Sequence, residues 1–251
     1  MIADLLAETR DVVRSVWSGR LGLAGDAFSQ GVHLSERDDL DVVVVVRLDA
    51  AVVAVGPASA VDRLGSLEVD ELSEAPAVLA ALAPSGGRLL ASASLAYADR
   101  GTVRDSVPDR VHDRVLVGPG DGSRVAPASA EQVRDVLTAC SPAERDESGL
   151  AEMASWSVSL TDDGAAAGAA GFEVWPTAPE HDGGLAHLGV AVASSFRGSG
   201  HGVAAGAAAI SAALDRGLVP QWRASVDNPT SLALGVRLGC RPIGHQLVVT
   251  V

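Results

Sequence analysis

The chain has 251 residues, a formal net charge of −13 and no lysine, so arginine supplies all of its basic side chains. This length suits one large domain or two domains of ordinary size. The acidic balance argues against a nucleic-acid-binding surface; it weakly favours cationic small molecules as ligands, but it is also common in soluble proteins without any such ligand. The lack of lysine excludes a lysine nucleophile or Schiff base.

No apolar run approaches the roughly 18 residues of a membrane span, and Asp4, Glu8 and Asp11 interrupt the start of the chain, unlike a secretory signal peptide. Cys140 and Cys240 lie far apart, without the close spacing of a zinc cluster or a disulfide framework. We therefore expect a cytoplasmic protein that uses no metal, binds neither membrane nor nucleic acid, and has two buried thiols. The sequence does not decide between a monomer and a homodimer.

The first half of the chain predicts a mixed α/β unit. Apolar residues between Ile2 and Trp17 recur at helical spacing, which predicts an amphipathic helix. Further on, strands are expected at 41–47 and 51–55, and helices near 58–64 and 75–83. Segment 118–122 is rich in glycine and proline, which is typical of a domain boundary. We place the boundary near residue 122, giving an N-terminal domain at 1–122 and a second domain at 123–251.

The second half predicts alternating helices and strands. Ser129, followed three residues later by Gln132, forms a capping-box signature, and Asp163-Gly164 suits the turn of a hairpin. The expected elements are helices at 129–137 and 142–153, strands at 155–160, 169–175 and 185–192, a helix at 202–216, a strand at 221–226, a helix at 229–238 and a strand at 246–251. This order predicts a mixed sheet, flanked by helices, whose later strands include parallel neighbours.

A glycine-rich loop follows the strand expected at 185–192 and precedes a helix of small residues. Its sequence is Arg197-Gly198-Ser199-Gly200-His201-Gly202. Free amides and the dipole at a helix start attract anions, glycines let the backbone approach a phosphate, and Arg197 adds a guanidinium. The spacing differs from a dinucleotide-binding loop, because Val203 stands where the third glycine would be, and a Walker loop requires lysine. Taken alone, the loop is equally consistent with a structural turn.

The wider context makes this pattern specific. The loop matches the R/Q-x-x-G-x-G/A motif of the GNAT superfamily of acyl-CoA-dependent N-acyltransferases. Downstream, Asn228-Pro229-Thr230-Ser231 and Leu238-Gly239-Cys240 resemble the N-x-x-S and L-G-F of that family. Segment 123–128, followed by the capped helix, resembles its first strand and helix. The resemblance covers roughly residues 123–251.

The resemblance implies a GNAT-like central mixed twisted sheet, preceded by a smaller mixed α/β N-terminal domain whose element order is compatible with a degenerate copy of the same fold. It implies acetyl-CoA as co-substrate and direct attack by a primary amine of a small molecule or peptide, with no covalent enzyme intermediate. The residues implied to bind the cofactor are Leu188, Val190 and Val192 through the strand backbone, Arg197, Gly198, Ser199, Gly200, His201, Gly202 and Val203 around the pyrophosphate, and Asn228 and Ser231 beside it.

Two side chains are candidates for the general base that removes the proton of the amine. His187 begins the cofactor strand, and Glu173 lies on the preceding strand. An unperturbed histidine has a pKa near 7, whereas a glutamate needs burial to reach that range, and Gly189 and Ala191 share the face of His187 by strand alternation. We therefore favour His187 over Glu173. A satisfied structural histidine and a solvent-facing carboxylate are the alternatives.

The sequence also departs from the family pattern. Where relatives often carry a tyrosine that protonates the departing thiolate, this chain has Gly235, and its only tyrosine is Tyr97 in the first half. Cys240 replaces the usual phenylalanine. A CoA thiolate can leave near neutral pH without full protonation, so the missing tyrosine need not abolish activity. These differences from the family pattern concern catalysis more than cofactor binding. Two alternatives to an enzyme therefore remain: a catalytically weak or inactive acyl-CoA-binding sensor or scaffold, and an interaction module for a protein partner.

Overall fold

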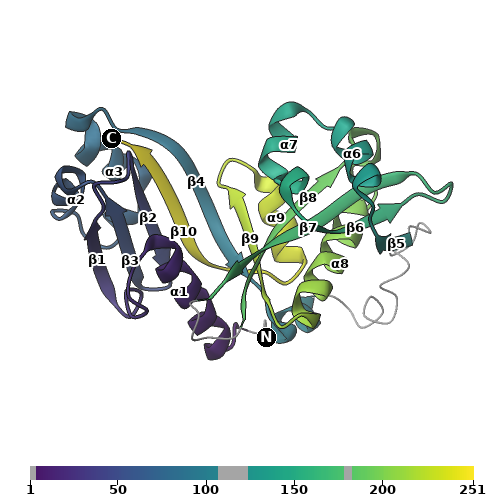
Figure 1. Ribbon diagram of the computed structural model, residues 1–251, viewed down its shortest axis with the longest axis horizontal. Helices are drawn as coiled ribbons and strands as arrows, with labels where there is room; N and C mark the ends of the chain where they lie inside the picture. Colours follow the sequence, from purple (N-terminus) through teal and green to yellow (C-terminus); the bar gives the residue numbers. More distant parts are fainter. Residues whose placement is uncertain (1–3, 107–123, 178–182) are drawn as a thin grey trace.

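The computed structural model describes residues 4–106, 124–177 and 183–251 (Figure 1). The first half comprises α1 (Ala7–Leu21), β1 (Gly31–Glu36), β2 (Val42–Leu48), β3 (Ala51–Gly56), α2 (Ala58–Leu64), α3 (Ala75–Leu82), β4 (Arg88–Tyr97) and α4 (Arg100–Ser106). The second half comprises β5 (Arg124–Pro127), α6 (Ala130–Thr138), α7 (Pro142–Ser148), β6 (Ser155–Leu160), β7 (Ala166–Pro176), β8 (Gly184–Val192), α8 (His201–Asp215), β9 (Val219–Ser225), α9 (Pro229–Arg237) and β10 (Arg241–Thr250).

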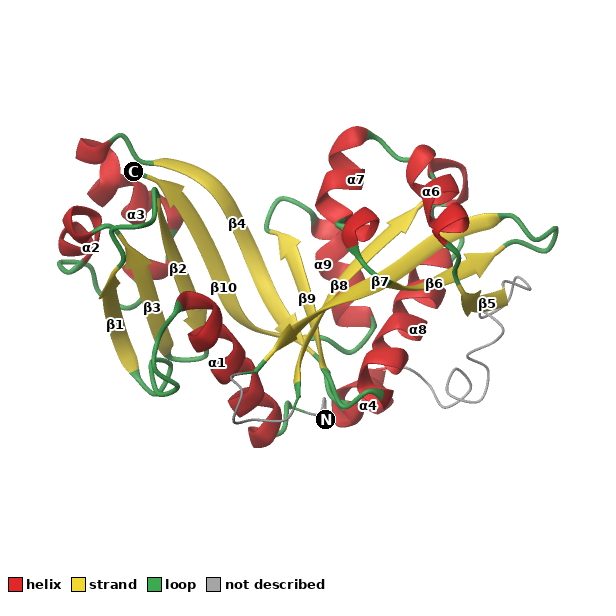
Figure 2. Ribbon diagram, in the orientation of Figure 1, coloured by secondary structure: helices red, strands yellow, loops and turns green. Residues whose placement is uncertain are grey.

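The strands of the described residues form one ten-stranded sheet in the order β1-β3-β2-β10-β4-β9-β8-β7-β6-β5. The strands of both halves follow one another across the view in Figure 2. The pairs β1·β3 and β8·β9 are parallel and the other neighbours are antiparallel. Strand β10, drawn in yellow in Figure 1, lies between β2 and β4 of the first half. The expected mixed sheet flanked by helices is confirmed, including parallel neighbours in the second half.

Most expected elements appear within a few residues of their predicted bounds. Ser129 and Gln132 form both hydrogen bonds of the predicted capping box. The first half contains strands as well as helices, but its relation to a second copy of the fold stays a prediction. The expected boundary near residue 122 lies outside the described residues, so the division into domains 1–122 and 123–251 also stays a prediction. Two strands, β1 and β4, were not predicted.

Helices cover both faces of the sheet. On one face, α1 packs where the two halves meet and α6 packs over the second half. On the other face, α2 and α3 cover the first half, while α8 and α9 cover the second. Along β8, Leu185 packs in the cluster with α1 and Ala191 in the cluster with α6, whereas Leu188 packs with α8. Since side chains alternate along a strand, His187 lies on the face of α1 and α6.

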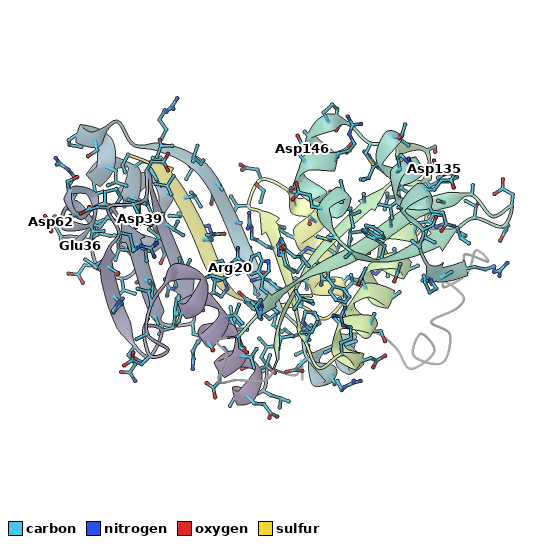
Figure 3. All side chains as sticks on the ribbon, viewed as in Figure 1. Arg20, Glu36, Asp39, Asp62, Asp135 and Asp146 are labelled. Carbon is cyan, nitrogen blue, oxygen red and sulfur yellow. The ribbon has the colours of Figure 1, made fainter. Side chains whose placement is uncertain are left out.

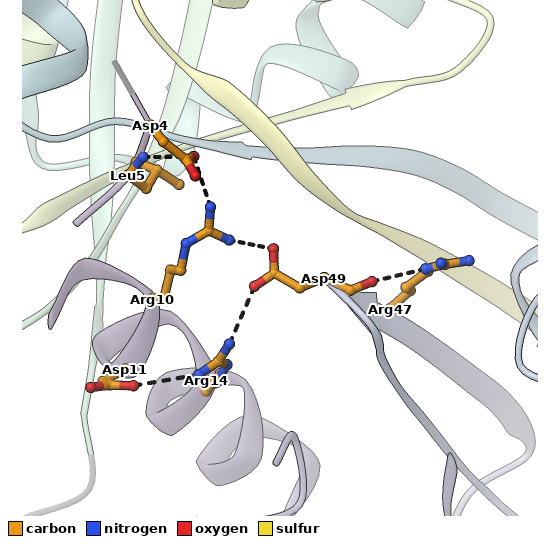
Figure 4. Close-up of polar contacts among 7 residues, drawn as sticks. All are labelled: Asp4, Leu5, Arg10, Asp11, Arg14, Arg47 and Asp49. Atoms are coloured by element: carbon orange, nitrogen blue, oxygen red, sulfur yellow. Dashed lines mark hydrogen bonds and ion pairs between the residues drawn. The ribbon is translucent and has the colours of Figure 1, made fainter. Parts of the chain in front are cut away.

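Helix α1 is fastened to the first half by an ionic network (Figure 4). Arg10 pairs with both Asp49 and Asp4, and Arg14 Nη2 lies 3.3 Å from Asp49 Oδ2. Asp49 occupies the turn between β2 and β3, where its φ of 52° is one that aspartate tolerates better than most residues. The helix also packs against Leu185 of β8 and Trp175 of β7, so it joins the two halves. No helix within the described ranges is long and apolar enough to cross a bilayer.

Candidate functional site

Strands β8 and β9 separate partway along their length. They pair through only three residue pairs, the last of which joins His187 to Gln221. Beyond that point β8 follows β7 as far as Val192, while β9 follows β4 as far as Ser225. Within the described part of the chain, the backbone of residues 188–192 therefore has no strand partner on its β9 side. Because the side chains of Leu188 and Val190 belong to the core around α8, only their main chain can bind a ligand here.

The glycine loop joins the end of β8 to α8 and leaves its backbone open. Gly198 and Gly200 have φ values of +79° and +89°, and apart from the chain neighbours no described residue has an atom within 4 Å of the position that a Cβ would take at either glycine. Gly202 lets α8 approach β8, because a Cβ there would lie 3.1 Å from Val192 Cγ2. No side chain among the described residues caps α8, so its first amides are available to an anion. This open backbone fits a pyrophosphate.

The side chains of two expected cofactor residues, His201 and Ser231, make hydrogen bonds within the protein. His201 is buried, with Nδ1 2.9 Å from Ser159 Oγ, so only its backbone amide can contact a phosphate. Ser231 Oγ accepts a hydrogen bond from Trp222 Nε1 at 3.2 Å. The Ser231 amide donates to Asn228 Oδ1 at 3.0 Å, which makes Asn228 the N-cap of α9. These side chains shape the site rather than provide free ligands.

Two carboxylates of α7 hold the side chains of Arg197 and Asn228, which are both expected to bind the cofactor. Arg197 Nη1 lies 2.8 Å from Glu144 Oε1, and Asn228 Nδ2 donates to Glu147 Oε1 at 3.0 Å. Hydrogen bonds from the backbone and hydroxyl of Ser141, followed by Arg197, lower the pKa of Glu144 to about 2. Glu144 therefore stays ionised at neutral pH. An anionic cofactor has to exchange with it to gain the Arg197 guanidinium.

The favoured base, His187, stands where β8 and β9 part. Its ring stacks on Trp175, with centroids 4.5 Å apart, and its Nδ1 lies 3.1 Å from Gln221 Oε1. Gln221 donates through Nε2 to Tyr97 Oη, so its Oε1 is the acceptor and the His187 proton belongs on Nδ1. Burial, followed by the nearby Arg223 guanidinium, lowers the pKa of His187 to about 4. The imidazole is thus neutral at pH 7, with the lone pair of Nε2 free of the Gln221 bond.

Two expectations about His187 are wrong. The pKa of His187 lies well below the unperturbed value near 7 that was expected for it. The small neighbours do not open a path either, because Gly189 is covered by α7 and the segment after it. A Cβ at Gly189 would come within 2.0 Å of the Ser148 carbonyl oxygen and 2.8 Å of Met153 Cε. The ring instead lies toward Trp175.

Glu173 lies directly opposite His187 in the β7–β8 register, so the structure brings the two candidate bases together. Its side chain is exposed, and Oε2 accepts a hydrogen bond from Trp175 Nε1 at 2.9 Å. Trp175 therefore contacts both candidates, His187 by its ring face and Glu173 by its indole nitrogen. Because Glu173 is exposed and its Oε2 already accepts from Trp175 Nε1, His187 is the better placed base.

Tyr97, at the end of β4, belongs to the same site although it comes from the first half of the chain. Trp17 Nε1 of α1 donates to its hydroxyl at 2.7 Å, and Gln221 Nε2 donates at 3.0 Å. Burial raises the pKa of Tyr97 well above its ordinary value. The hydroxyl is fully enclosed, so Tyr97 orients Gln221, and through it His187, rather than meeting a ligand. Nothing local in the sequence links these residues, because the contact depends on β4 pairing with β9.

The comparisons with known proteins agree with the loop and strand geometry. Residues 130–239 match the family model of the acetyltransferase (GNAT) family. The C-terminal region of the chain therefore belongs to the GNAT acetyltransferase family, and its half of the sheet has the fold of that family. No curated protein matches the chain.

Several solved structures are similar to the chain at low identity. A GCN5-related N-acetyltransferase from Kribbella flavida is 16% identical, over 70% of this chain and 63% of that one, with a TM-score of 0.45. A tandem GNAT protein from the clavulanic acid biosynthesis pathway is 18% identical, over 71% and 59%, with a TM-score of 0.45. Glucosamine-6-phosphate N-acetyltransferase from Arabidopsis thaliana is 15% identical, over 45% and 90%, with a TM-score of 0.34. The chain spans about three fifths of the length of the first two.

Proposed function

We propose that this protein transfers an acetyl group from acetyl-CoA to a primary amine of a small molecule or peptide, by direct attack in a ternary complex. The main support for the proposal is the separation of β8 and β9 at His187. Beyond this point an unpaired stretch of the β8 backbone runs from the neutral imidazole of His187 to the open glycine loop. The loop amides and Arg197 bind the pyrophosphate, and residues 188–192 bind the pantetheine arm through their main chain. The cofactor supplies an activated thioester carbonyl.

In this proposal His187 accepts the proton of the amine through Nε2 while Gln221 holds Nδ1–H. A base with a pKa of about 4 is too weak to deprotonate an alkylammonium ion before attack. It instead serves an acceptor that reaches the site as the free amine and loses its proton as the new bond forms. We therefore expect the pH profile to rise with deprotonation of the acceptor, not with titration of His187.

Release of CoA thiol with a panel of primary amines tests the proposal. His187→Asn keeps an amide N–H close to the position of Nδ1 and removes the Nε2 lone pair, so it should lower kcat/KM by about 10² to 10⁴, the range for loss of a general base. Glu173→Gln, which can still accept from Trp175, should cost less. Both variants should retain CoA affinity. Loss of activity in Glu173→Gln alone would reverse the assignment, and full activity in both would indicate proton removal through water.

A second candidate function is a catalytically weak or inactive acyl-CoA-binding sensor or scaffold. The packing of Gly235 favours it, because a Cβ there would lie 2.7 Å from Trp222 Cδ1 and leaves no room for a proton-donating tyrosine. Tight CoA binding without thiol release across the amine panel would support this candidate over the enzyme.

A further inference from the structure

We propose that the acceptor amine carries an oxyanion, a carboxylate or a phosphate, and that Arg20 and Arg223 bind it. This inference rests on the proposed function, because it places the acceptor beside His187. It adds a class of acceptor that the acidic composition of the chain does not suggest.

The two arginines, which we call the arginine pair, flank His187 from different elements. The Arg20 guanidinium carbon, near the end of α1, lies 3.6 Å from the centroid of the Trp175 ring, and Trp175 stacks on His187. Arg20 lies in the middle of the molecule in Figure 3. Arg223 follows Gln221 by two residues on β9, so it shares the face on which Gln221 bonds to His187.

Neither guanidinium group of the arginine pair makes an ion pair or a hydrogen bond with any described residue, and both side chains are exposed. Glu173 is the carboxylate that acts on Arg20, but its Oε2 already accepts from Trp175 Nε1. Partial burial, followed by the charge of Arg20, lowers the pKa of Arg223. The two guanidinium groups therefore repel each other, and one carboxylate, Glu173, does not balance both positive charges.

An anion bound between two guanidinium groups would relieve this repulsion. Guanidinium groups match carboxylate and phosphate oxygens through paired N–H donors, and the match is strongest where water is partly excluded. The positive field at this face is local, since the protein as a whole carries a charge of −13. Simple polycationic amines would be repelled here. An acceptor with both groups would place its oxyanion on the arginine pair and its amine near His187 Nε2.

Matched amines that differ in one charge test the inference. In the presence of CoA, we would compare β-alanine with β-alaninamide and O-phosphoethanolamine with ethanolamine, by isothermal titration and by thiol release. The charged member of at least one pair should bind about 10- to 100-fold more tightly, the value of one or two charge-assisted hydrogen bonds, and should have a correspondingly lower KM. The pair that shows the preference tells carboxylate from phosphate.

Variants connect that preference to the named residues. Arg20→Gln and Arg223→Gln should each reduce the preference about tenfold and leave CoA affinity unchanged, while Arg63→Gln on α2, exposed and in the first half, should change neither. Equal binding within both amine pairs, or a preference that survives both substitutions, would overturn the inference. Thiol release with neutral amines would then still support the transferase. Anion binding that depends on Arg20 and Arg223 without any thiol release would retain the anion site and overturn the transferase.

Discussion

The depressed pKa of His187 makes the stability of the protein depend on pH in a calculable way. The ordinary value is 6.5 and the folded value is about 4. Because the unfolded chain binds this proton at a higher pH than the folded chain does, the contribution is fully present above pH 6.5 and is lost as the pH falls toward 4. At pH 5 the unfolded group is mostly protonated and the folded group is not. The linkage relation then gives a loss of at most about 2 kcal/mol relative to pH 7.5.

Urea unfolding of the wild type and of His187→Asn at pH 7.5 and pH 5 measures this contribution. Carboxylates and His245, whose pKa is also lowered by burial, titrate in both proteins, so the difference between the two proteins isolates His187. The wild type should lose about 2 kcal/mol more than the variant between these pH values. His33→Asn, at an exposed position on β1, should behave like the wild type. Identical pH dependence in the wild type and His187→Asn would refute the described burial of the ring.

The remaining predictions concern the cofactor loop. Gly200→Val and Gly217→Val both place a β-branched residue at positive φ with open space around it, so each should cost about 1–2 kcal/mol of stability, but only Gly200→Val should abolish CoA binding by titration. Equal CoA affinity in the two variants would contradict the loop assignment. Glu144→Gln frees Arg197 and removes a nearby negative charge, so CoA should bind about three- to tenfold more tightly than to the control Glu131→Gln on α6; an equal affinity would show that the ion pair does not compete. Acetyl-CoA should raise Tm in thermal unfolding, whereas free adenosine should barely do so, and equal shifts would count against pyrophosphate recognition.

The parts of the fold that could be predicted are those with local signals. The helix that follows Ser129 carries its own cap, and β2 and β3 are continuous β-branched runs next to a short turn. Strand β1 gives no such signal, because it lies at the sheet edge and most of its side chains are exposed. Strand β4 begins with exposed residues and contains serine and alanine, and its position depends on pairing with β9 and β10. Because these partner strands are distant in the sequence, the residues of β4 alone do not reveal the pairing.

The same distinction applies to the candidate site. The glycine loop is contiguous, so its geometry follows from its own residues and from the helix after it. His187 and Glu173 were identified as candidates one strand apart, and the antiparallel register places them opposite each other. Tyr97 and Arg20 come from elements that precede the family region. Their positions depend on the pairing of β4 with β9 and on the packing of α1, so no spacing in the sequence reveals them.

The position of β10 has a consequence for biosynthesis. Strands β2 and β4 emerge from the ribosome long before β10, which later pairs with both of them. Until β10 arrives, two sheet edges with unpaired backbone groups face a vacant strand position, which is a state prone to incorrect pairing. We therefore expect residues 1–106, expressed alone, to be aggregation-prone and to recover soluble structure when residues 124–251 are supplied in trans. A stable, monomeric, folded 1–106 fragment would show that the first half completes its fold without the last strand.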